Sequence, residues 1–577
     1  MLRFNDHKQQ QLFDSWGHIS PKRRQMLDQS WPGLFRKYML PELPVREFAP
    51  FFDPGFGRPT KDISTVMGLL VLQQTLDLDD EEAIEQLAFN IQFHYALDIT
   101  EESDAALYIC PKTLWTMRRI AVENGLDSIL FQSGTQKLAS IFNVDTDKQR
   151  IDSVHIQSNM RRLARISIFS TAIHKFLKNL KRHHNALFAT VENGIIEQYL
   201  TEKALTCFAL VKPSQSHKSL QQVSSDLYRL ICRFKGHKDV ACMHSFKLLE
   251  RILNEQCQLG DDGRITVKEP KQIPSDSLQN PSDPDASYSG HKGQGYQVQV
   301  METYTDTDDK DQKAKTLNLI THVEVEQAHE SDAKALIPAI ESAQEMDLGP
   351  KQLLADSLYG SDANVEKAIT KGVEVISPPS GSEKQGKIGL SDFHIEKSGK
   401  VVSCPQGHAP IHSKKKKTRY CAAFASAHCA SCPNQAICPA ASGKKGFYLR
   451  FTEKQLRIAL RRVEIETDAF KDLYRWRSGV EATMSEYDRR TGVKHLRVRG
   501  FKAVRFSARL KALGLNILRA AAVMAAMAWL PPETDPNRRY RADFNNIKER
   551  FWATFCIIVR IFSCSPKVLA ICPKLCL

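Results

Sequence analysis

The chain has 577 residues, of which 42% are hydrophobic and 25% charged, as expected for a globular protein of about two to four domains. Its formal net charge of +14 predicts an anionic partner, most simply nucleic acid, with a solvated basic surface as the alternative. Fourteen cysteines are too few for a disulfide-rich secreted protein, and the charged start Met1–Lys8 has no secretory signal. We therefore expect a cytoplasmic protein without membrane association.

Residues 1–148 are expected to form a helical domain. Apolar residues recur at helical spacing between Ile63 and Gln74, and the acidic stretch Asp79–Glu85 is typical of the first turn of another helix. A turn at Cys110 leads into a helix with a basic end. Small helical domains of this kind often bind DNA, although a helical packing module would explain the same pattern.

A short buried strand is predicted at residues 149–156, and it contains an acidic residue, Asp152. A carboxylate inside a strand costs several kcal/mol to bury unless it is paired or holds a metal ion. The simpler alternative is an aspartate that caps a turn. Asp152 becomes a candidate for chemistry only if other carboxylates reach the same place.

A strongly basic helical insertion is predicted at residues 157–256. Such a helix face is expected to lie along a phosphate backbone, although a charge run is more often a solvated surface. The candidate DNA contacts at its start are Arg161, Arg162 and Arg165. A polar linker, residues 268–289, follows the insertion.

Alternating strand and helix signals then predict a mixed α/β sheet. Strands are expected at residues 295–301, 317–325, 352–357 and 372–376, with helices at 331–346 and from Gly360 onward. Asp356 ends the third of these strands. Asp152 and Asp356 therefore both lie at or near strand ends, where α/β folds place their active sites.

A second insertion, residues 380–450, is rich in lysine and contains a cysteine cluster. One Cys-x-x-Cys pair with two further thiols indicates a structural Zn²⁺ site, and reduced cysteines in a β-rich insertion are the alternative. The preferred ligands are Cys404, Cys429, Cys432 and Cys438. Helices are expected again at residues 453–530, before a separate tail, residues 531–577.

A third carboxylate is predicted on a helix spanning residues 471–488. Tyr474, Arg477 and Glu481 share one face of that helix, and Arg477 and Glu481 are four residues apart. Taken alone, this pair is a surface ion pair worth about 0.3–0.5 kcal/mol. A dense basic run follows, however, with candidate DNA contacts at Arg489, Arg490, Lys494, Arg497 and Arg499. A carboxylate beside such a run suits a site that handles a polyanion.

Two aspartates at strand ends and one glutamate on a later helix fit two-metal phosphodiester chemistry. Hard divalent cations prefer oxygen ligands. Two such ions activate the attacking oxygen and stabilise the leaving one, and their ligands come from separate elements because these surround the metals.

These residues resemble the three signature blocks of the DDE transposases of bacterial insertion sequences, in the branch with a tyrosine-arginine-glutamate helix. The blocks are Asp152-Ser153, the segment Ala355–Gly360, and Tyr474-x2-Arg477-x3-Glu481. Gly57-Arg-Pro59 and the linker Asp283–Ala286 add to the likeness. The branch often has a lysine seven residues after the glutamate, and this chain has Asp488 there.

The resemblance implies an RNase H-like core formed by residues 149–376 and 453–530. It implies that Asp152, Asp356 and Glu481 hold two Mg²⁺ ions, with Mn²⁺ as a substitute, and that Tyr474 and Arg477 contact DNA phosphates. The expected reaction frees a 3′-hydroxyl at each end of the element and joins it to target DNA. A homodimer would bring the two ends together, with the N-terminal domain and the first insertion binding the terminal inverted repeats.

Two other functions fit the same residues. One is a nuclease on the same fold that cuts DNA without joining it. The other is a DNA-binding relic that keeps the fold but no longer reacts. The complete set of three carboxylates argues against the relic.

Overall fold

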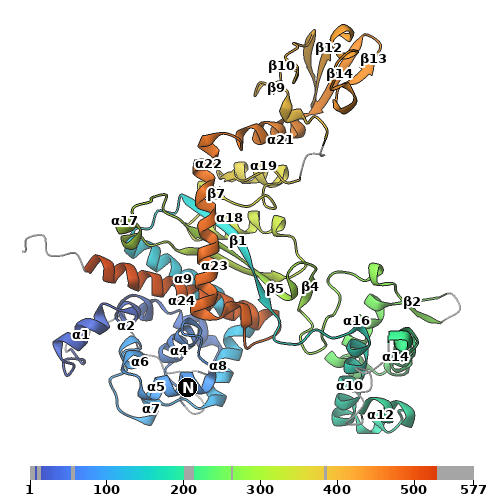
Figure 1. The fold of residues 1–577 in the computed structure, drawn as a ribbon. Helices are drawn as coiled ribbons and strands as arrows, with labels where there is room; N and C mark the ends of the chain where they lie inside the picture. Colours follow the sequence, from blue (N-terminus) through green and yellow to red (C-terminus); the bar gives the residue numbers. More distant parts are fainter. Residues whose placement is uncertain are drawn as a thin grey trace, which may run out of the picture. The chain divides into compact units, whose positions relative to one another are not determined.

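The computed structural model describes residues 5, 7–8, 14–53, 59–200, 213–260, 264–381 and 386–528 (Figure 1). The chain divides into a unit of residues 1–523 and a second unit of residues 524–577. Of the second unit only residues 524–528 are described, as the end of a helix. The expected separate tail, 531–577, lies outside the described residues.

The N-terminal part is helical, as predicted. Its central helix, α4 (Ile63–Thr75), is buried on almost every side, which suits its apolar composition. The next helix, α5 (Asp80–Phe89), begins at a capping box between Asp79 and Glu82. The other elements are α1 (Pro21–Asp28), α2 (Trp31–Leu34), η1 (Phe35–Met39), η2 (Leu40–Glu42), α3 (Val45–Phe48), η3 (Ala49–Phe51), α6 (Ile91–Ala96), α7 (Asp104–Leu107), α8 (Pro111–Glu123) and α9 (Leu126–Phe142).

A mixed sheet follows, which confirms the predicted α/β core. Its strands are β1 (Lys148–Gln157), β4 (Ser287–Ser289), β5 (Gly293–Thr303), β6 (Ile320–Gln327), β7 (Gln352–Leu354) and β8 (Glu374–Ile376). The order is β4-β5-β1-β7-β8, and β6 also pairs with β5. β1 runs antiparallel to β5 and parallel to β7. The helices between the strands are α17 (Lys310–Lys315), η5 (Asp332–Lys334), α18 (Leu336–Glu345) and α19 (Asp362–Thr370).

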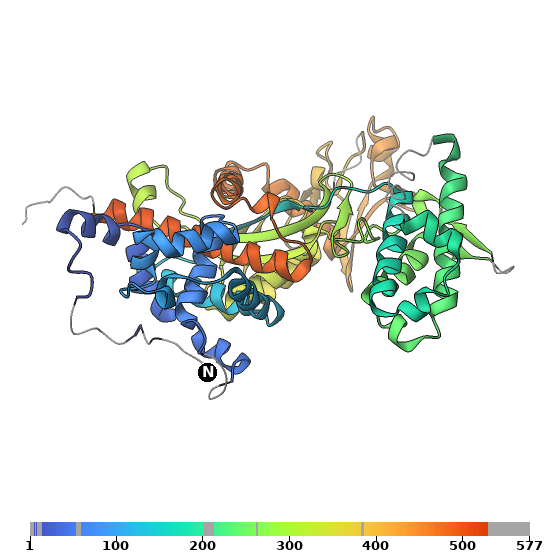
Figure 2. The same cartoon turned by 90° about the horizontal axis from the view of Figure 1, so that it is seen from below.

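The first insertion has a hydrophobic core of its own, and its helices form the teal and green bundle in Figure 2. In the first helix of this insertion, α10 (Arg165–His183), apolar residues such as Phe169, Ile173 and Phe176 recur at helical spacing and are buried. The remaining elements are α11 (Asn185–Phe188), α12 (Asn193–Leu200), α14 (Pro213–Phe234), α15 (Lys238–Ala241), α16 (His244–Gln256), β2 (Cys257–Leu259), β3 (Ile265–Val267) and η4 (Pro270–Gln272). The predicted helical insertion is therefore confirmed.

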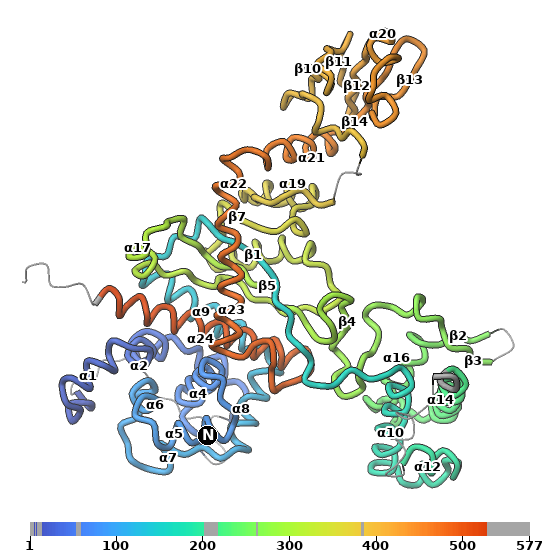
Figure 3. The backbone as a smooth tube through the Cα atoms, viewed as in Figure 1, coloured from blue at the N-terminus to red at the C-terminus, as the bar shows by residue number. Residues whose placement is uncertain are grey.

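The second insertion is rich in β-strands and also has its own small core (Figure 3). Its main sheet has the order β11-β12-β14-β13, and β9 pairs with β10. The elements are η6 (Leu390–Asp392), β9 (His394–Ile395), β10 (Val401–Ser403), β11 (His412–Lys416), β12 (Arg419–Phe424), α20 (Ser426–Cys429), η7 (Gln435–Ile437), β13 (Ala441–Gly443) and β14 (Gly446–Thr452). We call residues 390–452 the cysteine subdomain.

Residues 471–488 are helical throughout, as predicted, but they fall into three segments and do not form one α-helix. They are α22 (Asp468–Tyr474), the 3-10 turn η8 (Arg475–Ser478) and α23 (Gly479–Thr491). Gly479 begins α23 where the Arg150 guanidinium lies so close that a methyl group would overlap it. The chain can pass here because glycine has no side chain. The helical segments before and after this stretch are α21 (Glu453–Glu464), η9 (Val493–His495) and α24 (Phe501–Ala528).

Helix α24 is the one helix among the described residues that is long and apolar enough to cross a membrane. In its most apolar window, 61% of the residues are nevertheless buried inside the protein. It also carries Arg509 and Arg519, which pair with acidic residues of other elements. The packing of α24 is therefore that of a largely buried helix of the protein.

The polar linker is held in place by one buried carboxylate. Asp283, only 1% exposed, accepts hydrogen bonds from the hydroxyls of Ser158 (2.5 Å) and Tyr296 (2.6 Å) and from the Gly500 amide (3.1 Å). These groups belong to the end of β1, to β5 and to the start of α24. The linker that follows the first insertion is therefore attached to the sheet.

A second buried carboxylate joins the sheet to α23. Glu302, on β5, is fully buried and accepts hydrogen bonds from Arg150 Nε (2.7 Å), Thr483 Oγ1 (2.7 Å) and Arg519 Nη1 (3.0 Å). Arg150 also donates to the Trp476 carbonyl (2.8 Å) in η8. We call this set the Glu302 network. It attaches η8 and α23 to the strand that carries Asp152.

Replacing Glu302 by Gln is expected to lower the free energy of unfolding by about 3 kcal/mol, because the buried Arg150 would lose its counter-charge and Arg519 would keep only Glu486. Urea unfolding followed by circular dichroism measures this change. The control is Glu341→Gln, which breaks an exposed ion pair with Lys371 and should change stability by less than about 1 kcal/mol. Equal effects of the two substitutions would contradict a structural role for the network.

Candidate active site

The two predicted aspartates lie on neighbouring parallel strands. Arg150 of β1 pairs with Leu354, the last residue of β7, so Asp152 lies two residues further along β1 and Asp356 lies two residues past the end of β7. Asp356 follows the end of β7, and its Oδ1 accepts a hydrogen bond from the Leu358 amide at 2.8 Å. Neighbouring parallel strands thus lead to both carboxylates, but Asp152 lies in the middle of β1 and not at its end as predicted.

The tyrosine-arginine-glutamate segment packs against these strands. Arg477 donates from Nη2 to Asp152 Oδ2 at 2.7 Å, and its Nη1 lies 3.7 Å from Glu481 Oε1. Tyr474 donates its hydroxyl proton to the Ala355 carbonyl, next to Asp356, at 3.2 Å. Arg477 therefore bridges two of the three carboxylates, and Tyr474 contacts the strand end that carries the other.

The third carboxylate points outward in this structure. The Glu481 side chain is 72% exposed in the first turn of α23. Within the described ranges, no three His, Cys, Asp or Glu side chains are arranged so that they could hold a metal ion. The three candidate side chains nevertheless all offer carboxylate oxygens, which is the ligand chemistry that hard divalent cations take.

Burial dominates the electrostatics of this site. It raises the pKa of Asp152, and the neighbouring Asp356 and Asp332 act in the same direction, while the Ser153 amide and Arg477 oppose the rise. Burial also raises the pKa of Tyr474, which stays a neutral hydrogen-bond donor. The site therefore holds Asp152 in an environment that disfavours its charge, as is common for functional carboxylates.

A polar network behind the aspartates was not predicted. The buried Tyr359 hydroxyl donates to Gln299 Oε1 (2.6 Å), and Gln299 Nε2 donates to Asp332 (2.8 Å) and Glu326 (3.0 Å). Tyr359 belongs to the block that contains Asp356, and Gln299 lies on the alternating strand β5. The sequence indicated only these two locations. The spacing of residues along the chain could not show that the Tyr359 and Gln299 side chains contact each other.

Another residue missed by sequence reasoning is Lys292, in the turn between β4 and β5. Its Nζ donates to Ser153 Oγ at 3.0 Å and lies 3.8 Å from Asp332 Oδ2. The ammonium group therefore sits beside the residue that follows Asp152. Its position in a glycine-rich turn gave no signal of this contact.

The predicted DNA-binding cations after α23 lie at the surface, and most already have partners. Arg490 pairs with Glu486 (2.8 Å), Lys494 with Asp488 (3.7 Å) and Arg497 with Asp77 (3.0 Å). Arg499 contacts the Met160 sulfur at 3.3 Å, and Arg489 is exposed. The departure from the family pattern at Asp488 therefore produces an internal ion pair with Lys494.

The three predicted cations of the first insertion differ in their surroundings. Arg161 is exposed, and Arg162 stacks over the Tyr288 ring with 4.3 Å to its centroid. Arg165 instead donates to the Gln256 side chain (2.7 Å) and carbonyl (3.0 Å). Burial lowers the pKa of Arg165. Arg165 thus connects the two ends of the insertion, which favours a structural role over the predicted DNA contact.

The four predicted thiols converge in the cysteine subdomain. Cys404, Cys429, Cys432 and Cys438 all line one small cavity of about 30 Å³, together with two histidines. All four are free thiols. Burial raises the pKa of Cys429, and the other three cysteines add to the rise. In the described residues, however, these thiols are not arranged closely enough to hold a metal ion.

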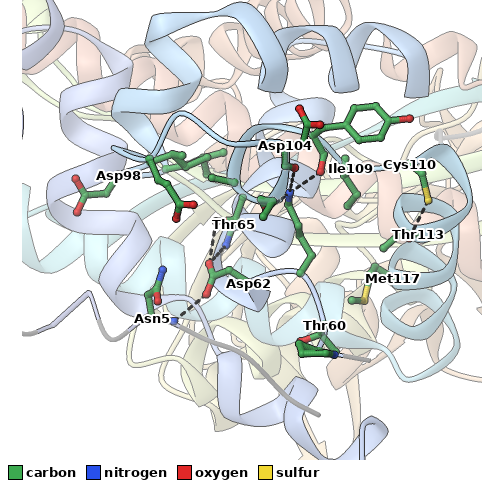
Figure 4. Close-up of a pocket in the computed structure, with 18 of the residues that line it drawn as sticks. Asn5, Thr60, Asp62, Thr65, Asp98, Asp104, Ile109, Cys110, Thr113 and Met117 are labelled. Carbon is green, nitrogen blue, oxygen red and sulfur yellow. Dashed lines mark hydrogen bonds between the residues drawn. The ribbon is translucent and has the colours of Figure 1, made fainter. Parts of the chain in front are cut away.

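A much larger cavity, of about 910 Å³, lies among the N-terminal helices (Figure 4). Its polar groups serve helix ends: Asp62 caps α4 by accepting from the Thr65 amide (2.8 Å) and also binds the Asn5 amide (2.8 Å). None of the candidate catalytic residues lines it. Size alone would therefore have indicated the wrong place for chemistry.

Comparisons with known proteins identify two parts of the chain. Residues 403–521 match a family model described as a transposase DDE domain. Residues 35–119 match a second model, described as a transposase domain (DUF772). The first match includes Tyr474, Arg477, Glu481 and the four thiols, whereas Asp152 and Asp356 lie outside both. No curated protein matches the chain.

Replacing Asp152 by Asn is expected to raise the melting temperature at pH 7. The pKa of Asp152 is higher in the folded protein than the unfolded value of 3.8. The contribution of the Asp152 carboxyl group to stability is therefore complete below pH 3.8, and it is lost as the pH rises through the folded pKa. The gain in melting temperature of Asp152→Asn should therefore become smaller as the pH is lowered toward 4. Thermal unfolding at a series of pH values measures it.

The matched control, Asp306→Asn, should change stability in the opposite direction. A hydrogen bond from Lys148 lowers the pKa of Asp306, so Asp306→Asn should lose stability at pH 7 and regain it in acid. A lower melting temperature for Asp152→Asn at pH 7 would show that the ion pair with Arg477 outweighs the burial of the charge.

Proposed function

We propose that the chain is a DDE transposase of an insertion sequence, an enzyme that cuts and joins DNA with divalent metal ions, and that Asp152, Asp356 and Glu481 are its catalytic carboxylates. The observation that supports this most directly is the position of Arg477. Its guanidinium lies between Asp152, on the sheet, and Glu481, on α23. Asp356 lies beside Asp152 on the adjacent strand.

The proposed reaction has two steps. Water first attacks the phosphodiester bond at each end of the element, the bond from phosphorus to the 3′ oxygen breaks, and a free 3′-hydroxyl remains. That hydroxyl then attacks a phosphodiester bond of target DNA and displaces the 3′ oxygen of the target strand. Both steps move negative charge onto oxygen atoms around one phosphorus.

Two Mg²⁺ ions are the proposed cofactor, with Mn²⁺ as a substitute. When bound, such ions activate the attacking oxygen and stabilise the leaving one. Asp152, Asp356 and Glu481 would hold them, because all three donate only carboxylate oxygen. Arg477 and Tyr474 are positioned to contact the phosphate of the element's end, since both lie against the aspartates.

The wider DNA contacts belong to the same proposal. The N-terminal helices and the first insertion, with Arg161 and Arg162 at its start, would bind the terminal inverted repeats. Arg489, Arg490, Lys494, Arg497 and Arg499 would add contacts to phosphates next to α23. A homodimer acting in the cytoplasm would hold the two ends together, because two ends must be cut and joined in one event.

Replacing Asp152 or Asp356 by Asn, or Glu481 by Gln, should each reduce cleavage at the element's ends by at least about a hundredfold, because each removes a proposed metal ligand. The purified chain is incubated with Mg²⁺, inverted-repeat DNA and a target plasmid, and cut and joined products are measured on a gel. Asp472→Asn is the control, since this exposed carboxylate precedes Tyr474 by two residues.

The same assay separates the other functions. Cut ends without joined products would identify a nuclease. Binding of the ends without cutting by the unaltered chain would identify a relic. Full activity of any of the three variants would remove that residue from the proposed site.

A structural Zn²⁺ site is proposed separately for the cysteine subdomain. It is supported by four free thiols around one small cavity, three of which also pack against the hydrophobic core of the subdomain. Thiolates are the usual ligands of structural zinc, and such a site stabilises small folds that have little core. The role of the metal would be to hold the subdomain together.

Purified protein is expected to contain one zinc ion per chain, measured by mass spectrometry of the metal content. The double variant Cys429→Ser/Cys432→Ser should lose the zinc, and the melting temperature should fall. Cys421→Ser is the matched control, because Cys421 lies in the same subdomain but outside the cavity. Zinc-free protein with an unchanged melting temperature after chelation would contradict the site.

A further inference from the structure

The cysteine subdomain has an unusually one-sided charge. Residues 397–452 contain no Asp or Glu. Their basic residues are Lys397, Lys400, Lys414, Lys415, Lys416, Lys417, Arg419, Lys444, Lys445 and Arg450. Such a stretch has strong positive potential whatever its detailed conformation. The strand register shows where much of this charge is gathered.

One face of the β11-β12-β14-β13 sheet is hydrophobic. Tyr420, Ala422 and Phe424 of β12 and Leu449 and Phe451 of β14 form the core of the subdomain on that side. Side chains alternate between the two faces of a strand. The residues between these positions must therefore point to the other face.

Cations occupy that other face on three adjacent strands. Lys414 pairs with Cys421 across the strands, Lys416 with Arg419, and Cys421 with Arg450, so all these side chains share one face. The four cations are exposed. In the described part of the chain none of them pairs with a carboxylate. We call this surface the basic sheet face.

An aromatic ring completes the face. Tyr448 pairs with Ala423 and so lies on the same side of the sheet, and the Arg450 guanidinium stands 5.2 Å from its ring centroid. The ring supports the arginine side chain in an extended position. Strands lie about 4.8 Å apart, and side chains two residues apart along a strand are about 7 Å apart. The four cations therefore form a compact, flat grid.

We propose that the basic sheet face binds duplex DNA through its phosphates, without regard to sequence, and that this DNA is the target. Lysine and arginine contacts to phosphates position DNA but do not read its sequence. The face is flat and has no helix that could enter a groove, which suits DNA of any sequence better than a specific inverted repeat. This inference rests on the proposed function, because that function supplies a target duplex.

The same strand provides a matched control. Lys415 lies between Lys414 and Lys416 but points to the core side, where it pairs with Glu453 at 2.8 Å and stacks on the Tyr420 ring. Lys415→Gln removes the same charge from the same strand. Its exposed ion pair contributes little to stability, so the fold should be unaffected.

The test compares the triple variant Lys414→Gln/Lys416→Gln/Arg450→Gln with Lys415→Gln and the unaltered chain. Binding of a random-sequence duplex is measured at several salt concentrations. Each lost phosphate contact should reduce the slope of log affinity against log salt by about 0.9, so the triple variant should lose about 2–3 units of slope and about tenfold or more in affinity. Lys415→Gln should bind nearly as the unaltered chain does.

A second measurement separates this inference from the proposed function. The triple variant should still cut inverted-repeat ends at the normal rate but join them to target DNA more slowly. An unchanged salt slope in the triple variant, with an unchanged melting temperature, would overturn the DNA-binding face while leaving the catalytic proposal intact. Loss of end cleavage in the three carboxylate variants tests the catalytic proposal alone.

Discussion

The buried charge of Glu302 is the constraint on which the rest of the molecule depends. A fully buried carboxylate is stable only when counter-charges and hydrogen bonds replace its hydration. Here Arg150 of β1, Arg519 of α24 and Thr483 of α23 all supply them. These groups come from three separate segments, and each of them is thereby attached to β5, which carries Glu302. The network thereby fixes the helix that bears Glu481 against the strand that bears Asp152.

Much of this architecture could be predicted from sequence, because local patterns reflect local structure. The alternation at residues 295–301 identified β5, and the apolar run around Asp152 identified β1. The mixed sheet followed from the order of strands and helices. The three blocks around Asp152, Asp356 and Glu481 were recognisable as a set because each has a distinctive neighbourhood in the sequence.

The parts that could not be predicted are long-range contacts between charged groups. Arg150 lies 152 residues from Glu302, and no spacing rule relates the two. The 3-10 turn within the predicted helix at 471–488 was not foreseen either, and the close approach of the Arg150 guanidinium to Gly479 is visible only in three dimensions. Arg165 likewise looked like a DNA contact in a basic run, whereas its partner Gln256 is 91 residues away.

The first insertion separates β1 from every strand with which it pairs, and this has a consequence for biosynthesis. When β1 leaves the ribosome, neither β5 nor β7 has been made, and the helices made next, α10 to α16, can collapse around their own hydrophobic core before β5 appears. β1 therefore stays unpaired while more than a hundred further residues are synthesised. Unpaired strand edges are prone to associate with other chains during such a delay. Because α23 is made later still, the three proposed catalytic carboxylates are all present only after residue 481 has been synthesised.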